Sequence, residues 1–501
     1  MNLSDLFDLS LRCRRHEAAL EIGERTWSFA ELDERSRRWA AFLAGSGIGR
    51  GERLGLLLPN GIDLVEVFLA AARLGAAVVP MNVLYREREL AHLSADSEPR
   101  AVVTTAELAA RLPTGTSTVL VEEAAAPVAR TPPVRGRSTV SGGDAALVAY
   151  TSGTTGRAKG AVLTHDNLAA NALVLDTCWR LSPSDRLLLA LPLFHLHGLG
   201  NGLHTWLSTG FRLRLLDRFR KETILDELER FRPTVFFGVP TMYERLCAAP
   251  PERARRIGRS MRLFVSGSAP LPGATLERFR ELFGHAILER YGMTEALMIA
   301  SNPYAGERRP GSVGLALPGV SLRLAAPDGN AAPTEAGEVG EVEVRGPSVF
   351  AGYWRDSEAT RAAFTADGWF RTGDLGTLAP DGYLTLVGRR SDLIISGGFN
   401  VYPREIEDLL REQPSVAEAA VVGELDAVRG EVPVAYVVAA EGARIDATAL
   451  EATCRAALAS FKVPRRFEVV PELPRNALGK VERARLGAGA DARSPTPRGR
   501  G

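Results

Sequence analysis

The spacing of apolar and polar residues predicts alternating strands and helices. From Arg53 onward, "RLGLLLPNGIDLVEVFLAAARLGAAVVPMN" contains an apolar run, a turn at Pro59-Asn60, and apolar residues at helical spacing to about Arg73. A second apolar run extends from Ala76 to Pro80. A strand, an amphipathic helix and a strand in this order are typical of a βαβ unit, which builds a parallel sheet covered by helices.

The same alternation recurs further along the chain. Apolar runs begin after Asp185, after Pro233 and near Arg262, and each ends at Gly, Pro or Ser. Residues 124–144 are rich in Pro, Gly and Ser, which predicts a connecting loop. The pattern changes near Arg390 and Ser391, where a strand, a polar turn, a strand, a glycine pair and a helix from Pro403 follow one another. We therefore place a domain boundary at this turn.

Composition limits the class of partner. The chain has 501 residues, with 61 basic and 60 acidic side chains and a net charge of +1, which gives no electrostatic reason for binding nucleic acid or an anionic membrane. Its four cysteines are scattered, as reduced thiols usually are. No signal peptide and no apolar run of about 18 residues is evident. We expect a cytoplasmic protein that acts on small molecules.

A glycine-rich segment follows the apolar strand "ALVAY" and is a candidate for binding polyphosphate. Glycines turn backbone N–H groups toward an anion, hydroxyls add donors, and lysine adds charge. Its candidate ligands are Thr151, Ser152, Gly153, Thr154, Thr155, Gly156 and Lys159. Lys159 precedes Gly160 instead of Ser or Thr, which disfavours the P-loop of kinases and motors. Because a plain flexible loop has the same composition, the other motifs must decide.

Seven motifs occur in one order between residues 150 and 480. They are "YTSGTTGRAKG", "LPLFHLHG", "GSAPL", "ERYGMTE", "FRTGD", "GRRSDLIISGG" and "PRNALGK". Together they resemble the motifs of the acyl-adenylate-forming superfamily, which includes acyl-CoA synthetases, luciferases and peptide-synthetase adenylation domains. The resemblance implies that a carboxylate attacks the α-phosphate of ATP to give acyl-AMP and pyrophosphate, and that the thiol of CoA then displaces AMP. It also implies Mg²⁺ as cofactor, with ATP and CoA as co-substrates.

The resemblance further implies a fold and a domain division. We expect an α/β fold with a large N-terminal domain of parallel α/β sheets, a barrel-like β portion around "GSVGLALPGVSLRL" and "GEVGEVEVRGP", and a small mobile C-terminal α+β domain. The expected bounds are 1–389 for the domain that binds AMP and the acyl group, 390–392 for a hinge, 393–486 for the lid, and 487–501 for a disordered tail. Fewer than 25 residues follow Lys480, so we expect no carrier-protein domain in the chain.

Each motif residue matches one part of this chemistry. Thr294 can donate to the α-phosphate, Glu295 is a hard oxygen ligand for Mg²⁺, and Lys480 can balance charge in the transition state. With His195, which the family places beside the acyl pocket, these are the expected catalytic residues, whereas His197 is expected to be structural. The ATP site is expected to include Tyr291, Asp374 and Arg389, the last two at the ribose. Gly397 and Gly398 are expected to meet the thiol of CoA.

Two positions depart from the superfamily pattern. Ala158 stands where the glycine-rich loop commonly has proline, which should loosen the turn without removing a donor. Ser391 stands at the hinge, where Asp or Lys is usual. Serine should still permit rotation of the C-terminal domain between the two half-reactions.

Arg290 indicates which kind of carboxylic acid the enzyme activates. If residues 286–291 form a strand beside the acyl pocket, an arginine there requires an anion, and Arg245 and Ser268 can complete a fork for a second carboxylate. In these positions the chain most resembles malonyl-CoA synthetases. Malonate is therefore the expected substrate, and the sequence does not separate it from methylmalonate. Arg308 and Arg309 are expected to be structural.

Two other functions stay open at this stage. In a medium-chain or aryl acyl-CoA synthetase, Arg290 would pair internally and leave an apolar pocket. A non-catalytic nucleotide-binding relative would have lost catalytic residues, yet Thr294, Glu295, Asp374 and Lys480 are all present.

Overall fold

The fold was analysed in a computed structural model that describes residues 1–136, 138–151, 158–326, 337–396, 399–426, 428–476 and 479–486. The chain forms two compact units. The first comprises Met1–Arg323, Glu343–Arg371 and Asp381–Leu384. The second comprises Leu324–Val342, Thr372–Pro380 and the chain from Thr385 onward. A hinge at 390–392 stays a prediction, because the division into two units reflects how residues pack and not how the units move.

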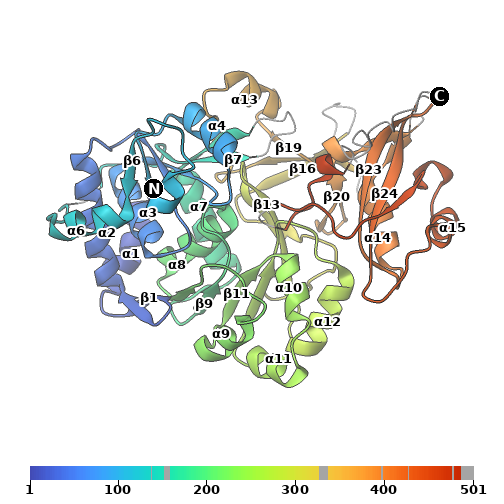
Figure 1. The fold of residues 1–501 in the computed structure, drawn as a ribbon, viewed down its shortest axis with the longest axis horizontal. Helices are drawn as coiled ribbons and strands as arrows, with labels where there is room; N and C mark the ends of the chain where they lie inside the picture. The colour runs from blue at the N-terminus through green and yellow to red at the C-terminus, as the bar shows by residue number, and fades with distance from the viewer. Residues whose placement is uncertain are drawn as a thin grey trace, which may run out of the picture. The chain divides into compact units, whose positions relative to one another are not determined.

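The largest sheet of the first unit has nine strands, and its six central strands run parallel (Figure 1). In spatial order the strands are β15 (Leu315–Ala316), β14 (Leu297–Ser301), β13 (Leu288–Met293), β12 (Leu263–Ser266), β11 (Val235–Gly238), β9 (Arg186–Leu189), β10 (Arg212–Leu215), β1 (Ala18–Ile22) and β2 (Arg25–Ser28). The apolar runs predicted after Asp185, after Pro233 and near Arg262 are β9, β11 and β12, and the fold class is confirmed.

The second sheet of this unit has seven strands and contains the predicted βαβ unit. In order they are β18 (Gly352–Tyr353), β8 (Lys159–Thr164), β7 (Ala145–Thr151), β4 (Ala77–Pro80), β3 (Arg53–Leu57), β5 (Ala101–Thr104) and β6 (Thr118–Leu120). β3 and β4 pair in parallel and are joined by helix α3 (Ile62–Leu74). In this sheet β8 pairs antiparallel with both of its neighbours, β7 and β18, and the other pairings are parallel.

The remaining helices of the first unit connect and cover these strands. They are α1 (Leu3–Cys13), α2 (Phe29–Gly45), α4 (Glu87–Ser97), α5 (Ala106–Ala109), α6 (Val121–Arg130), α7 (His165–Cys178), α8 (His204–Thr209), α9 (Ile224–Phe231), α10 (Pro240–Leu246), α11 (Pro251–Gly258), α12 (Gly273–Phe283) and α13 (Ser357–Ala363), with a π-helical turn η1 at His197–Leu203. No helix among the described residues combines the length and apolar content that crossing a membrane requires.

Helix α6 corrects one expectation from the sequence. Residues 124–130 were expected in a connecting loop, but they continue a helix that contains Pro127. Val121, Ala124 and Val128 are buried on one side of it. This packing offsets the hydrogen bond that proline cannot donate.

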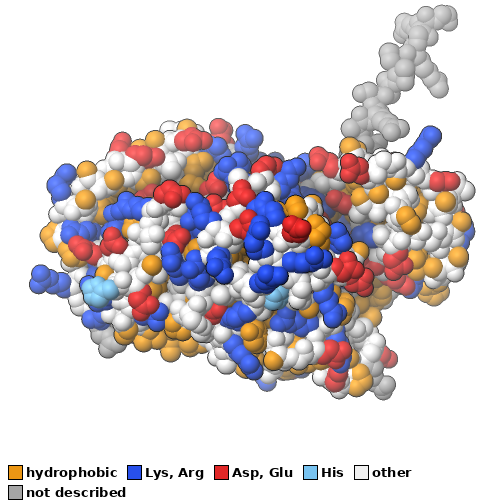
Figure 2. Space-filling view, turned by 90° about the horizontal axis from the view of Figure 1, so that it is seen from below, with side chains coloured by type: hydrophobic (Ala, Val, Ile, Leu, Met, Phe, Trp, Pro, Cys, Tyr) orange, Lys and Arg blue, Asp and Glu red, His pale blue; other side chains and the backbone are white. Residues whose placement is uncertain are grey.

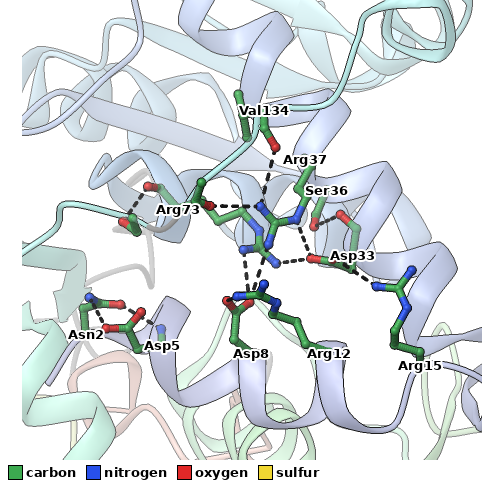
Figure 3. A network of polar contacts seen from close by, with 12 residues as sticks. Asn2, Asp5, Asp8, Arg12, Arg15, Asp33, Ser36, Arg37, Arg73 and Val134 are labelled. Carbon is green, nitrogen blue, oxygen red and sulfur yellow. Dashed lines mark hydrogen bonds and ion pairs between the residues drawn. The ribbon is translucent and has the colours of Figure 1, made fainter.

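An ion-pair network joins the first three long helices (Figure 3). Arg73 on α3 contacts Asp8 of α1 at 3.2 Å and Asp33 of α2 at 2.6 Å. Arg37, also on α2, donates to Asp33 at 2.8 Å. Burial lowers the pKa of Arg73, and the two carboxylates offset the cost of desolvating its charge. The network fixes the helix of the βαβ unit against its neighbours.

Charges of both signs lie on the face shown in Figure 2, with arginine and lysine gathered in its centre. Ion pairs of the first unit include those of Arg253 and Arg256 on helix α11 with Glu229 of α9, at 2.9 and 2.6 Å. Because these pairs are exposed to solvent, each contributes little to stability.

A four-stranded sheet contains β16 (Ser321–Ala325) and β17 (Gly340–Arg345), which come from the two segments predicted as a barrel-like β portion. Its strands, in order, are β16, β17, β19 (Phe370–Leu378) and β20 (Leu384–Arg389). The fourth sheet belongs to the second unit and contains β22 (Phe399–Val401), β21 (Ile394–Ser396), β24 (Gly430–Ala439), β23 (Val416–Asp426) and β25 (Phe467–Val469). Its helices are α14 (Pro403–Arg411) and α15 (Ala447–Ala457), with the short turns η2 (Arg390–Asp392), η3 (Ser460–Lys462) and η4 (Arg483–Arg485).

Candidate active site

Strands β7 and β8 bracket the glycine-rich segment. They pair antiparallel, and Thr151 at the end of β7 lies opposite Lys159 at the start of β8. The predicted phosphate ligands Ser152, Gly153, Thr154, Thr155 and Gly156 lie outside the described residues. The two ends of the segment are therefore placed, and the roles of its middle stay predictions.

Glu295 is the centre of a polar cluster beside these strand ends. Its Oε1 accepts a hydrogen bond from the Thr151 hydroxyl at 3.3 Å and another from the Tyr353 hydroxyl at 3.2 Å. The Lys159 ammonium lies 5.4 Å from the centre of the Tyr353 ring. Sequence reasoning missed Tyr353, which reaches the cluster because β18 pairs antiparallel with β8. The structure thus brings together three residues from two motifs, Thr151, Lys159 and Glu295, with one from outside the motifs.

The β13–β14 hairpin holds Glu295 and the predicted Thr294 in its turn. Tyr291 is buried in β13, and Thr294 is half-buried. A Cβ on Gly292 would lie 2.1 Å from the carbonyl oxygen of Leu297, so only glycine permits this close approach of the two strands. The tight hairpin fixes the direction of the side chains in the turn.

The donors around Glu295 fit a magnesium ion that is shared with phosphate. Mg²⁺ is usually held by one or two carboxylates together with substrate phosphates and water. Among the described residues, no group of three His, Cys, Asp or Glu side chains could hold a metal by itself. A single buried carboxylate among neutral hydroxyl groups matches the mode of binding in which the substrate supplies the other oxygens.

In the second unit, Asp374 and Arg389 form an ion pair with a distance of 3.0 Å between Nε and Oδ1. They lie on the neighbouring strands β19 and β20. Lys480 interacts electrostatically with both. Desolvation by the surrounding protein lowers the pKa of Lys480, Arg389 adds to this effect, and Asp374 opposes it. The predicted ribose-binding pair and the predicted catalytic lysine are thus neighbours in one unit.

A tight turn presents Lys480. Its backbone N–H donates to the Asn476 side chain at 3.0 Å, and its carbonyl accepts from the Asn476 N–H at 2.9 Å. Gly479 has a φ of +77°, which favours glycine. The predicted hinge residue Ser391 lies exposed in η2 and donates to Asp392 at 3.1 Å. Gly397 and Gly398 lie outside the described residues.

Arg290 lies in β13 and is buried, with 4% of its surface exposed. Its Nε and Nη2 have no hydrogen-bond partner among the described residues, and no carboxylate there forms an ion pair with it. Burial lowers its pKa to about 9, so the guanidinium is still charged at neutral pH. A buried cation without a counter-ion is costly unless an anion binds there.

Two histidines interact electrostatically with this guanidinium, and Ser268 contacts one of them. The Ser268 hydroxyl lies 3.2 Å from Nδ1 of His197, and the buried Nε2 of His197 has no partner among the described residues. Burial, followed by Arg290, lowers the pKa of both His195 and His197, that of His195 to about 4. His197, which was expected to be structural, contacts the predicted substrate ligand Ser268, and its role stays a prediction.

A backbone hydrogen bond fixes the tautomer of His195. Its Nδ1 accepts a hydrogen bond from the backbone N–H of His197 at 3.2 Å, so the neutral ring carries its proton on Nε2. The next residues form the π-helical turn η1, an element that often marks functional sites. His195 is therefore a neutral N–H donor at physiological pH.

The other predicted arginines lie apart from this cluster. Arg245 is exposed on α10, and its role in substrate binding stays a prediction. Arg308 donates to three backbone carbonyls, including that of Tyr304 at 2.9 Å. Arg309 pairs with Asp381 at 2.5 Å. The structural roles expected for Arg308 and Arg309 are confirmed.

Comparisons with known proteins agree with this site. Residues 7–354 match the AMP-binding enzyme family, and residues 405–480 match the AMP-binding enzyme C-terminal domain. A feruloyl-CoA synthase from Amycolatopsis sp is 38% identical over 94% of this chain and 95% of its own length. A malonate–CoA ligase from Arabidopsis thaliana is 34% identical over 88% of this chain and 78% of its own length.

Among solved structures, ATP-bound MatB from Rhodopseudomonas palustris superimposes with a TM-score of 0.91 and 40% identity. The match covers 97% of this chain and 98% of MatB. The family match over residues 7–354 spans most of the chain, and the two relatives match it over 95% and 78% of their own length. The chain therefore belongs to the AMP-binding enzyme family, in which it is an ATP-dependent, adenylate-forming acid–thiol ligase.

Proposed function

We propose that this ligase is a malonyl-CoA synthetase that also accepts methylmalonate. One carboxylate oxygen of malonate attacks the α-phosphate of ATP, and pyrophosphate leaves with the electrons of the broken P–O bond. The CoA thiol, as it loses its proton, then attacks the acyl carbon, and AMP leaves. Malonate keeps its second carboxylate throughout, so the enzyme must bind a dianionic substrate.

The buried Arg290, which has no counter-ion among the described residues, carries this proposal. A guanidinium presents parallel N–H donors that match the two oxygens of a carboxylate. The Ser268 hydroxyl can add a third donor when the Nδ1–H of His197 donates to its oxygen, because this leaves the single hydroxyl proton for the carboxylate. Neutral histidines suit this pocket, because they add donors without a second buried charge. A monocarboxylic acid would leave Arg290 without a counter-ion.

The exposed Arg245 can supply a second guanidinium to the distal carboxylate. Its side chain is exposed on α10. Methylmalonate differs from malonate by one methyl group, which an apolar pocket discriminates by only about 1–3 kcal/mol.

The residues that act on ATP follow the family assignment. Lys159 and the glycine-rich segment would hold the β- and γ-phosphates, with Thr294 donating to the α-phosphate. Glu295 would hold Mg²⁺, which neutralises charge on the phosphates when it is bound. Asp374 and Arg389 would bind the ribose, and Lys480 would balance negative charge during adenylation. Gly397 and Gly398 would meet the CoA thiol after rotation about Ser391, between the lid 393–486 and the domain 1–389.

An aryl or medium-chain acyl-CoA synthetase is the alternative, because the feruloyl-CoA synthase is as similar in sequence as the malonate–CoA ligase. The test is pyrophosphate release with ATP, Mg²⁺ and CoA across malonate, methylmalonate, succinate, acetate, octanoate and 4-coumarate, with mass detection of the thioester. A preference for malonate or methylmalonate supports the proposal. A preference for octanoate or 4-coumarate overturns it and leaves the adenylation chemistry intact.

A further inference from the structure

Helix α4 contacts both ends of the glycine-rich segment. The imidazole Nε2 of His92 lies 2.8 Å from the carbonyl oxygen of Ala158, the residue before β8. One helical turn later, Asp96 accepts a hydrogen bond from the hydroxyl of Tyr150 in β7. Residues four apart lie on the same side of a helix. One face of α4 therefore meets the chain just before and just after residues 151–157.

The chemistry of these two hydrogen bonds determines which group donates in each. A carbonyl oxygen only accepts, so His92 carries a proton on Nε2 and donates it to Ala158. Burial, followed by Asp96, raises the pKa of Tyr150, so its hydroxyl stays a donor. The rings of His92 and Tyr150 also meet edge to face, with centroids 6.1 Å apart. The two contacts support each other through this ring pair.

Trp354, which directly follows β18, holds Asp96 in place. The indole N–H of Trp354 donates to the backbone carbonyl of Asp96 at 3.1 Å, and the Trp354 backbone N–H donates to the Gly160 carbonyl at 2.7 Å. The end of α4 is thus tied to β8 as well as to β7. Helix α4 itself is held by Leu90 and Leu93, which are buried in the apolar core. Its stability does not depend on the half-buried imidazole of His92.

We propose that His92 and Asp96 are positioning residues that set the two ends of the glycine-rich segment for binding ATP. This inference rests on the proposed role of that segment as the phosphate loop, but not on which acid is activated. Neither residue touches the reacting atoms. Each acts through the backbone or side chain that it holds.

The test is the variant His92→Ala, with the dissociation constant of ATP measured by calorimetry and steady-state kinetics measured with whichever acid the enzyme accepts. The loss of one hydrogen bond predicts that the dissociation constant and KM for ATP rise about 3- to 10-fold. The kcat at saturating ATP and the KM for CoA should change less than about 2-fold. His92→Gln should restore most ATP affinity, because its amide can donate to the same carbonyl.

His285→Ala is the matched control. The His285 Nε2 lies 2.9 Å from the Gly258 carbonyl, the same kind of contact at a place remote from the glycine-rich segment. Its ATP affinity should equal that of the wild type. Equal ATP affinity in His92→Ala and the wild type, or equal losses in the two alanine variants, would overturn the inference. If the wild type binds ATP but activates another acid, the malonate proposal fails and this test still stands.

Discussion

Gly267 lies directly against the guanidinium of Arg290. A Cβ built on Gly267 would fall 2.4 Å from Arg290 Cζ and 2.6 Å from its Nε. Real carbon atoms never approach so closely without bonding, so any side chain at 267 must displace the guanidinium. The glycine between β12 and Ser268 therefore provides the space in which the arginine lies.

The first prediction concerns this contact. Gly267→Ala should shift the Arg290 side chain and raise the KM for malonate at least about 10-fold, because the geometry of a bidentate pair tolerates little displacement. The KM for ATP should stay within about 2-fold of the wild type. Steady-state kinetics with each substrate varied in turn checks this. An unchanged KM for malonate would show that the carboxylate binds elsewhere.

Replacement of Arg290 should lower activity on malonate without lowering the stability of the fold. Arg290→Gln removes a buried cation that has no counter-ion in the described part of the chain, so the melting temperature should stay the same or rise. The kcat/KM for malonate should fall at least about 100-fold, because a charged hydrogen-bonding partner is lost. Differential scanning calorimetry and the thioester assay measure the two effects. Arg309→Gln is the control, since that arginine pairs with Asp381 on the surface. Full malonate activity in Arg290→Gln would contradict the assignment.

Lys480 should act in only one half-reaction. Lys480→Ala should abolish formation of acyl-AMP while the variant still forms thioester from supplied malonyl-AMP, since only the first step develops charge at the carboxylate and the α-phosphate. Pyrophosphate exchange and single-turnover thioester formation measure the two steps. Lys462→Ala, which removes a surface lysine paired with Glu405, is the control. Equal loss in both half-reactions would refute this division of roles.

The parts of the fold that were predicted from sequence depend on local patterns. The βαβ unit at 53–80 follows from apolar spacing and a Pro-Asn turn, and the order of motifs identifies the residues around Thr151, Glu295 and Asp374. Residues that approach from distant parts of the chain were not predictable. His197 interacts electrostatically with Arg290, 93 positions away, and His92 bonds to the Ala158 carbonyl, 66 positions away. In α6, burial of one face outweighs the helix-breaking tendency of Pro127, which local propensity alone cannot show.

The last prediction concerns acid stability and rests on His204. This side chain is fully buried between the rings of Phe7 and Phe68, with centroids 5.6 and 5.2 Å away, and both of its nitrogens lack a partner among the described residues. Burial lowers its pKa to about 3. His165, in which Nδ1 accepts from the Leu3 N–H at 3.2 Å, has its pKa lowered to about 4, also by burial.

A histidine with a lowered folded-state pKa stabilises the protein fully above its unfolded value of about 6.5. Below that pH the unfolded chain binds protons that the folded chain does not, so stability falls, and for His204 the loss continues to about pH 3. Each such histidine contributes a slope of up to about 1.4 kcal/mol per pH unit. His204→Leu removes one of them and keeps an apolar side chain between the two phenylalanines. Urea unfolding at pH 7.5, 6.0 and 5.0 should therefore show a shallower loss in His204→Leu than in the wild type. Parallel losses in the two proteins would mean that His204 is already charged in the folded state or still neutral in the unfolded one.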